Sequence, residues 1–171
     1  MSLKHIRDRI RHETHNIYMY DFSGKKAVRK SKNVALLSAI DESIIETLDL
    51  LGGEAELGGF RFLFREFIRK NQFLDQIICF FYNGKILGAV GPITILKDPY
   101  GVEFMPPPYF GVCAKFRRSG IGNIIWMQAM RIGADMGAKY ILLQARKKSP
   151  ACEFYQSHRY LLAGKISSHW V

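Results

Sequence analysis

The sequence predicts a mixed α/β fold, with a mostly antiparallel sheet, one parallel β-α-β unit and helices on both faces. The apolar runs 76–82 and 85–90 flank Asn83-Gly84, a dipeptide that favours the tight turn of an antiparallel hairpin. Further on, the short apolar runs 109–114 and 140–145 enclose a long helical pattern. Strand, helix and strand in this order are typical of a right-handed crossover between parallel strands.

Length and composition favour one globular domain with a sizeable core. The chain has 171 residues, of which 48% are hydrophobic and 13% aromatic, and this composition argues against disorder. No apolar run is long enough for a membrane span, and the charged N-terminus does not resemble a secretory signal. The cysteines Cys79, Cys113 and Cys152 form neither a disulfide nor a zinc pattern, which favours buried thiols in the cytoplasm.

The net charge is +10, and much of it comes from the N-terminal 32 residues, where nine Lys or Arg minus three acids give +6. We therefore expect residues 1–32 to be a basic extension and residues 33–171 to be the main domain. Within the extension, residues 2–14 predict a short helix, 17–22 an extra edge strand and 25–32 a solvated basic loop. A basic arm can also bind a nucleic acid or another polyanion, so that alternative stays open.

The next segment predicts a strand and two helices. Residues 34–37 form a short strand, and Asp41 caps a helix that ends at Gly52-Gly53. A glycine-rich loop with two acids, Glu54 and Glu56, leads to a helix over residues 60–67 with an apolar face and an arginine face.

Turn residues divide the part that follows the hairpin. Residues 98–101 form a turn, and 102–105 begin a strand that Pro106-Pro107-Pro108 interrupt, because proline cannot donate to a central ladder. At the other end of the chain, residues 164–171 predict a last edge strand.

A basic turn between the run 109–114 and the helix 121–136 is the main candidate site. It contains Arg117, Arg118, Gly120 and Gly122. The first N–H groups of a helix have no partner within the helix and are partly positive, and glycine lets a ligand approach them closely. The turn therefore predicts a phosphate or pyrophosphate site, although glycines at such turns are also found for purely structural reasons.

A second helix start follows the strand 140–145. Ser149 is an expected N-cap and Pro150 suits the first helical position. This places Tyr155 about a turn and a half into the helix.

These two motifs resemble those of the GNAT superfamily of N-acetyltransferases. The turn Arg117-x-x-Gly120-x-Gly122 looks like the family's acetyl-coenzyme A pyrophosphate motif, and Ala151-x-x-Phe154-Tyr155 looks like its fourth-helix signature. Two positions differ from the family pattern: Lys148 replaces a frequent Asn, and Arg159 replaces a usual Gly.

The resemblance implies direct transfer of an acetyl group from acetyl-coenzyme A to a primary amine of a small molecule or peptide. It implies that Tyr155 donates to the leaving thiolate, and that an N–H of the strand ending at Val112 stabilises the carbonyl oxygen. Glu103 is the candidate general base, with a solvated surface role as its alternative. The expected cofactor-binding residues are Phe110, Val112, Arg117, Arg118, Ser119, Gly120, Ile121 and Gly122.

Other candidates remain open at this level. His158 follows Tyr155 by three residues and is either a second candidate base or a surface histidine. Cys113 follows Val112 and is either the site of an acyl-cysteine intermediate or a core thiol. Glu54 and Glu56 can recognise a cationic amine or merely be solvated. A non-catalytic coenzyme A sensor or RNA-binding module, an O-acceptor, a longer acyl chain and a homodimer are also compatible with the sequence.

Overall fold

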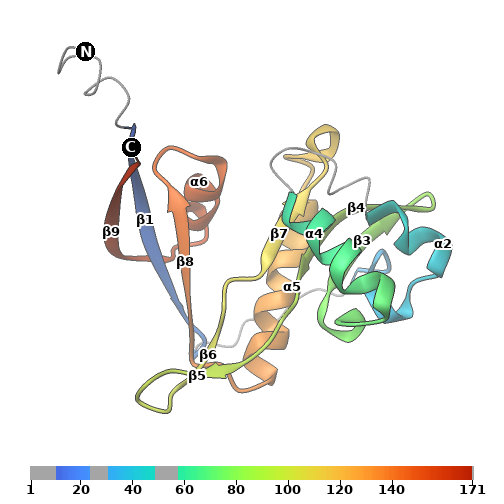
Figure 1. Cartoon of the computed structure of the whole chain (residues 1–171), viewed down its shortest axis with the longest axis horizontal. Coiled ribbons are helices and arrows are strands. Elements are labelled where there is room, and N and C mark those ends of the chain that lie inside the picture. Colours follow the sequence, from blue (N-terminus) through green and yellow to red (C-terminus); the bar gives the residue numbers. More distant parts are fainter. Residues whose placement is uncertain (1–10, 24–30, 49–57, 171) are drawn as a thin grey trace. The chain divides into compact units, whose positions relative to one another are not determined.

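The computed structural model describes residues 11–23, 31–48 and 58–170 (Figure 1). The chain divides into two compact units: the described residues of Met1–Asp21 and Tyr140–Val171 form unit 1, and those of Phe22–Lys139 form unit 2.

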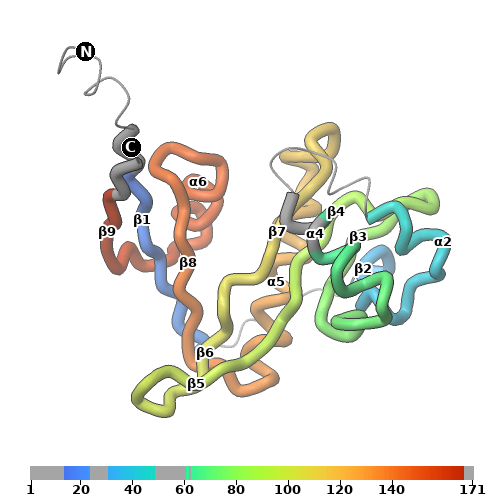
Figure 2. Tube along the Cα trace, in the orientation of Figure 1, coloured from blue at the N-terminus to red at the C-terminus, as the bar shows by residue number. Residues whose placement is uncertain are grey.

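Unit 2 contains a four-stranded antiparallel sheet in the order β2, β3, β4, β7 (Figure 2). Its strands are β2 (Val34–Leu36), β3 (Ile78–Tyr82), β4 (Lys85–Gly91) and β7 (Tyr109–Val112). A smaller hairpin joins β5 (Leu96–Lys97) to β6 (Glu103–Met105).

The hairpin between β3 and β4 confirms the strongest turn signal in the sequence. Asn83 has φ 49° and Gly84 has φ 68°, so both turn residues occupy the left-handed region. That conformation matches the twist of the flanking strands, and Asn and Gly adopt it at little cost. Ile78 pairs with Val90 across the ladder.

Helices cover both faces of the unit 2 sheet, as predicted. Gly88 faces α5 (Ile121–Asp135), because an added Cβ would lie 3.2 Å from Ile125 Cδ1. The adjacent Ala89 points to the opposite face and joins the apolar cluster that includes residues of α4 (Gly58–Glu66). The short helix α2 (Glu42–Ile45) begins at the predicted cap, where the Asp41 carboxylate accepts from Ser43 N.

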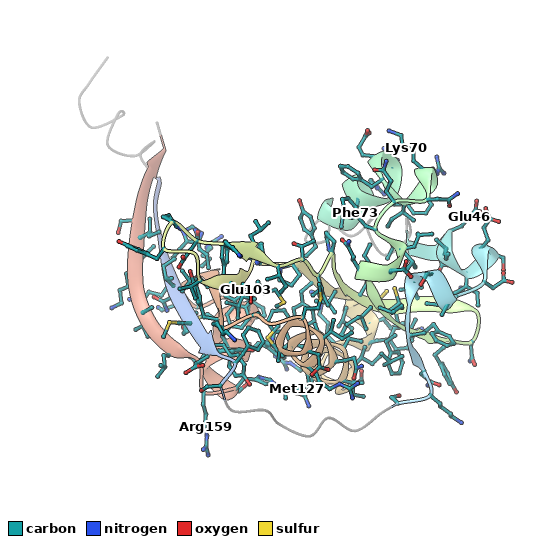
Figure 3. All side chains as sticks on the ribbon, turned by 90° about the horizontal axis from the view of Figure 1, so that it is seen from below. Glu46, Lys70, Phe73, Glu103, Met127 and Arg159 are labelled. Carbon is teal, nitrogen blue, oxygen red and sulfur yellow. The ribbon has the colours of Figure 1, made fainter. Side chains whose placement is uncertain are left out.

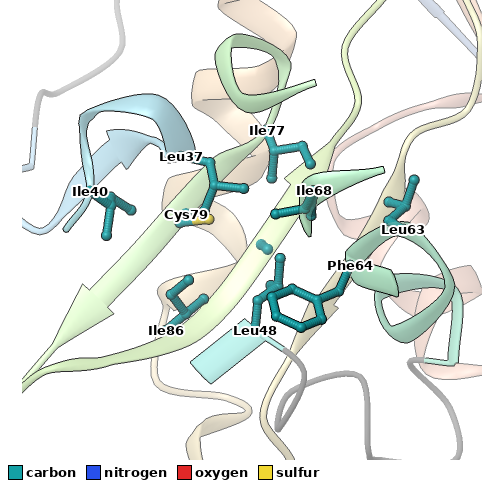
Figure 4. Close-up of a cluster of buried hydrophobic side chains, with 10 residues drawn as sticks. Leu37, Ile40, Leu48, Leu63, Phe64, Ile68, Ile77, Cys79 and Ile86 are labelled. Carbon is teal, nitrogen blue, oxygen red and sulfur yellow. The ribbon is translucent and has the colours of Figure 1, made fainter. Parts of the chain in front are cut away.

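The apolar cluster gives unit 2 its core on the α4 side of the sheet. Its members come from the sheet, from α4 and from the segments around them (Figure 4). They are Leu37, Ile40, Leu48, Leu63, Phe64, Ile68, Ile77, Cys79, Ile86 and Ala89. Four 3-10 turns complete the described elements: η1 (Leu37–Ala39), η3 (Ile68–Lys70), η4 (Leu74–Gln76) and η5 (Ala114–Phe116).

Unit 1 is a three-stranded antiparallel sheet in the order β8, β1, β9, with α6 beside it (Figure 1). The elements are β1 (Arg11–Asp21), β8 (Tyr140–Arg146), α6 (Pro150–Ser157) and β9 (Leu161–Trp170). The last strand lies at the end of this order, as predicted.

Strand β1 corrects two expectations. Residues 11–14 are strand rather than helix, and β1 is the middle strand rather than an extra edge strand, since it pairs with β8 and β9. The apolar spacing that suggested a helix begins at Leu3 and lies mostly outside the described residues. Partners from the distant C-terminal part of the chain decide the strand conformation, and no local pattern reports them.

Candidate functional site

The N-terminus of α5 forms a cradle, which we define as residues 117–122. Gly120 is the N-cap and has φ 87°, a left-handed conformation that suits glycine. It offers no side-chain cap to the helix, and the first turn of α5 holds no acidic residue. No N-cap side chain therefore accepts a hydrogen bond from the first N–H groups of this helix, and the helix dipole favours an anion beside them.

Close packing holds this helix start against the end of β7. A Cβ at Gly122 would lie 3.3 Å from Phe110 Cζ and 3.6 Å from Val112 Cγ2. Phe110 in turn packs against Trp126, with ring centroids 4.9 Å apart. A glycine at residue 122 thus lets the helix begin directly over the strand.

Two arginines form the first part of the cradle. Arg117 Nε donates to the carbonyl oxygen of Val112 at 3.1 Å, which ties this side chain to the end of β7. Arg118 has φ 62° and is exposed, and Ser119 Oγ donates to the carbonyl oxygen of Phe116 at 2.5 Å. The structure thus brings together the residues predicted to bind a phosphate.

Tyr155 lies in the other unit, on the face of α6 that is buried. Ser149 caps this helix, its hydroxyl accepting from Cys152 N at 3.2 Å, and Pro150 follows as predicted. The Tyr155 side chain is 7% exposed, and burial raises its pKa to about 12. Its ring contacts those of Tyr18 and Tyr160, with centroids 5.7 and 5.6 Å away.

A buried polar network beneath α6 was not predicted from the sequence. The Tyr18 hydroxyl lies 2.9 Å from Cys152 Sγ, and either atom can donate. Asn16 Nδ2 donates to the Tyr18 hydroxyl at 3.0 Å. Burial and the hydrogen bond to Cys152 raise the pKa of Tyr18. The sequence indicates only that residues 16 and 18, two apart in a strand, lie on the same face.

Glu103 does not lie beside the cradle. An added Cβ on Gly137, just beyond the C-terminal end of α5, would lie 3.0 Å from Glu103 Oε2. The carbonyl oxygen of Glu103 accepts from Lys139 N at 2.9 Å. The fifteen residues of α5 rise about 1.5 Å each, so Glu103 is about 22 Å along the helix from the cradle.

Of the other residues that the sequence offered as candidates, His158 and Cys113 contact neighbouring side chains or the backbone. His158 Nδ1 lies 2.8 Å from the carbonyl oxygen of Phe154, to which it donates, and the two rings pack at 4.2 Å. Cys113 is half-buried against the apolar cluster of unit 2. Glu54 and Glu56 lie outside the described residues.

Within residues 11–23, 31–48 and 58–170, no group of three or more His, Cys, Asp or Glu side chains is arranged to hold a metal ion. None of the helices described there has the length and apolar character needed to cross a membrane.

No protein-family model and no curated protein matches the sequence. Solved structures do match, at low identity. An acetyltransferase of the GNAT family from Novosphingobium aromaticivorans DSM 12444 has a TM-score of 0.62 and 13% identity, over 94% of this chain and 65% of that one. A GCN5-related N-acetyltransferase from Sphaerobacter thermophilus has a TM-score of 0.60 and 12% identity, over 98% of this chain and 54% of that one.

A third similar structure is nearer in length to this chain. It is an aminoglycoside acetyltransferase from an uncultured soil metagenomic sample, in complex with trehalose, with a TM-score of 0.52 and 16% identity over 92% of this chain and 94% of that one. This chain spans less than two thirds of the first two structures. At these identities the likeness concerns the fold, and it confirms the predicted mixed α/β class.

Proposed function

This chain has the fold of the GNAT acetyltransferases, and on that basis we propose that it transfers an acetyl group from acetyl-coenzyme A directly to a primary amine. The observation that carries the proposal is the cradle: an uncapped helix N-terminus with a left-handed glycine and two arginines. Such a turn suits a diphosphate, which coenzyme A contains.

In this proposal the cradle residues hold the pyrophosphate. The main-chain N–H groups of residues 118–122 point to its oxygens, and Arg117 and Arg118 add two permanent charges. Phe110 and Val112 support the cradle from β7 through their contacts with Gly122. A main-chain N–H at the end of β7 stabilises the carbonyl oxygen as it gains negative charge.

Tyr155 acts on the leaving sulfur in this proposal. As the amine nitrogen forms its bond to the carbonyl carbon, the carbon–sulfur bond breaks and a thiolate leaves. The pKa of Tyr155, about 12, lies well above a thiol's roughly 8.5, so complete proton transfer to the thiolate is uphill. Tyr155 therefore stabilises the thiolate by donating a hydrogen bond and keeps its proton.

In this proposal Glu103 is the base that accepts the amine proton, through a chain of water molecules. Glu103 lies about 22 Å along α5 from the cradle, so its role as the base is tested separately. A base of this kind controls the acid limb of the pH profile of kcat/KM. If Glu103→Gln keeps that limb, another group or solvent takes the proton.

The acceptor is proposed to be a small-molecule or peptide amine. One of the similar structures is an aminoglycoside acetyltransferase, which makes polyamine-like small molecules a reasonable first set to screen.

The test is release of free thiol from acetyl-coenzyme A by the purified protein, screened against aminoglycosides, polyamines and peptides with free N-termini. We expect amine-dependent thiol release, and acetylated product of the matching mass. Binding of acetyl-coenzyme A without amine-dependent release across the panel would instead favour a non-catalytic coenzyme A-sensing module.

A further inference from the structure

A buried polar network connects strand β1 to helix α6 within unit 1. The Tyr18 side chain is 1% exposed, and its hydroxyl lies 2.9 Å from Cys152 Sγ. Asn16 Nδ2 donates to that hydroxyl at 3.0 Å and reaches Cys152 Sγ at 3.5 Å. The three polar groups therefore fix one another.

The same Tyr18 side chain contacts Tyr155. The two ring centroids are 5.7 Å apart and the ring planes are tilted by 57°. Cys152 and Tyr155 are three residues apart on α6 and both are buried, so they share the helix face that meets β1. Tyr18 thus holds this face at two points, by its hydroxyl at Cys152 and by its ring at Tyr155.

Stability alone does not favour this network. The Asn16 side chain is 6% exposed, yet its Oδ1 has no hydrogen-bond partner in the described part of the chain. A buried acceptor without a partner destabilises the fold, whereas leucine has the same branched shape and would bury no polar atom. The asparagine therefore has a role that its contribution to stability does not explain.

We propose that Tyr18 is a positioning residue that holds the phenol of Tyr155 in its working orientation, and that Asn16 and Cys152 anchor Tyr18. The proposal rests on the proposed function, in which Tyr155 donates to the leaving sulfur. It assigns a role in the reaction to β1, a strand from the N-terminal segment.

The kinetic test compares single substitutions. Tyr18→Phe removes the anchoring hydroxyl but keeps the ring, and we expect kcat to fall about tenfold, because small errors in the placement of a reacting group are costly. The KM for acetyl-coenzyme A should stay within about twofold, since the cradle residues proposed to bind it are unchanged. Asn16→Leu should lower kcat similarly while leaving the melting temperature unchanged or higher.

The matched control is Tyr20→Phe. Tyr20 lies on the same strand and face, but its ring contacts Tyr160, at 4.9 Å. We expect its kcat to stay within about twofold of the parent. In a Tyr155→Phe background, Tyr18→Phe should have no further effect on kcat, because Tyr18 acts through the missing hydroxyl. An equal effect in both backgrounds would overturn the proposal.

A readout without turnover separates this proposal from the proposed function. In protein labelled with ¹³C-tyrosine, the ring signals of Tyr155 are those that vanish in Tyr155→Phe. They should shift and sharpen in Tyr18→Phe as the ring gains freedom, and move less in Tyr20→Phe. Tyr155 signals unchanged by Tyr18→Phe would contradict the positioning role. If those signals move but the parent releases no thiol, the anchoring stands and the transferase proposal fails.

Discussion

Tyr155 is a buried phenol whose hydroxyl, in the proposed reaction, meets the leaving sulfur. We predict that Tyr155→Phe lowers kcat about a hundredfold, the lower end of what a positioned proton or hydrogen-bond donor contributes. The KM for acetyl-coenzyme A should change little, because the cradle is intact. Steady-state thiol release measures both, and a kcat within about threefold of the parent would contradict the role.

The raised pKa of Tyr155 also predicts a pH dependence of stability. Its pKa is about 12 in the folded chain and roughly 10 when unfolded, so the folded state binds more protons between those values. The free energy of unfolding should therefore fall as the pH rises through that window. Urea unfolding of the parent at increasing pH should show this fall, and Tyr155→Phe should show a smaller one. Equal losses in both proteins would mean that Tyr155 titrates normally.

Arg159 follows α6 in a conformation that favours glycine. It has φ 60° in a C-terminal motif in which Tyr160 N donates to the carbonyl oxygen of Tyr155 and Arg159 N to that of Gln156. Helix α5 ends with the same bonding pattern, but has Gly137 at the matching position. The Arg159 side chain is exposed and projects outward (Figure 3).

We therefore predict that Arg159→Gly stabilises the protein by about 0.5–1 kcal/mol, through relief of the left-handed backbone. Arg159→Ala is the control, because it removes the same side chain but keeps the Cβ that causes the strain. Chemical unfolding measures both. A gain of equal size in the two variants would assign the effect to the side chain instead.

Arg118, at the turn before helix α5, is expected to affect the free energy of unfolding and the binding of coenzyme A in opposite ways. Its φ of 62° is strained for arginine, yet its charge borders the proposed diphosphate site. We predict that Arg118→Gly raises the free energy of unfolding by about 0.5–1 kcal/mol and weakens coenzyme A binding about tenfold.

The control Arg118→Lys keeps the charge and the strain, and should bind coenzyme A within about threefold of the parent. Calorimetric titration at two salt concentrations measures the affinities. If Arg118→Gly binds as tightly as the parent, the anion does not use this arginine.

Local patterns in the sequence predicted the elements whose conformation depends on near neighbours. Asn83-Gly84 specifies its own turn, Ser149 and Pro150 specify the start of α6, and the cradle depends on glycines six residues or fewer from its arginines. Strand β1 could not be predicted in this way. Asn16 and Tyr18 are fixed by β8, β9 and Cys152, all more than 120 residues away in the sequence.

The same contrast applies to the candidate site. Residues 117–122 are brought together by one turn, so a motif could reveal them. The Tyr18–Cys152 contact depends on the register in which β1 pairs with β8. The sequence shows only which side chains of β1 share a face, and this does not determine the register. The position of Glu103 was equally hidden, because it depends on where β6 runs past the end of α5.

For the molecule as a whole, acetyl-coenzyme A should raise thermal stability. A ligand at about 100 times its Kd stabilises the folded state by about 2.7 kcal/mol, and in a chain of this size that corresponds to a rise in Tm of about 5–10 °C. Pantetheine, which lacks the diphosphate, should give a far smaller rise at the same concentration. Equal shifts with both ligands would mean that the diphosphate contributes little.

In the proposed function, the N-terminus of α5 binds the diphosphate of coenzyme A. The most direct measurement is the change in backbone amide chemical shifts as coenzyme A is titrated into ¹⁵N-labelled protein, with pantetheine as the comparison. We predict that the amides of residues 118–122 show the largest changes with coenzyme A and small ones with pantetheine. Saturable binding that leaves these amides unmoved would contradict diphosphate binding at this helix N-terminus.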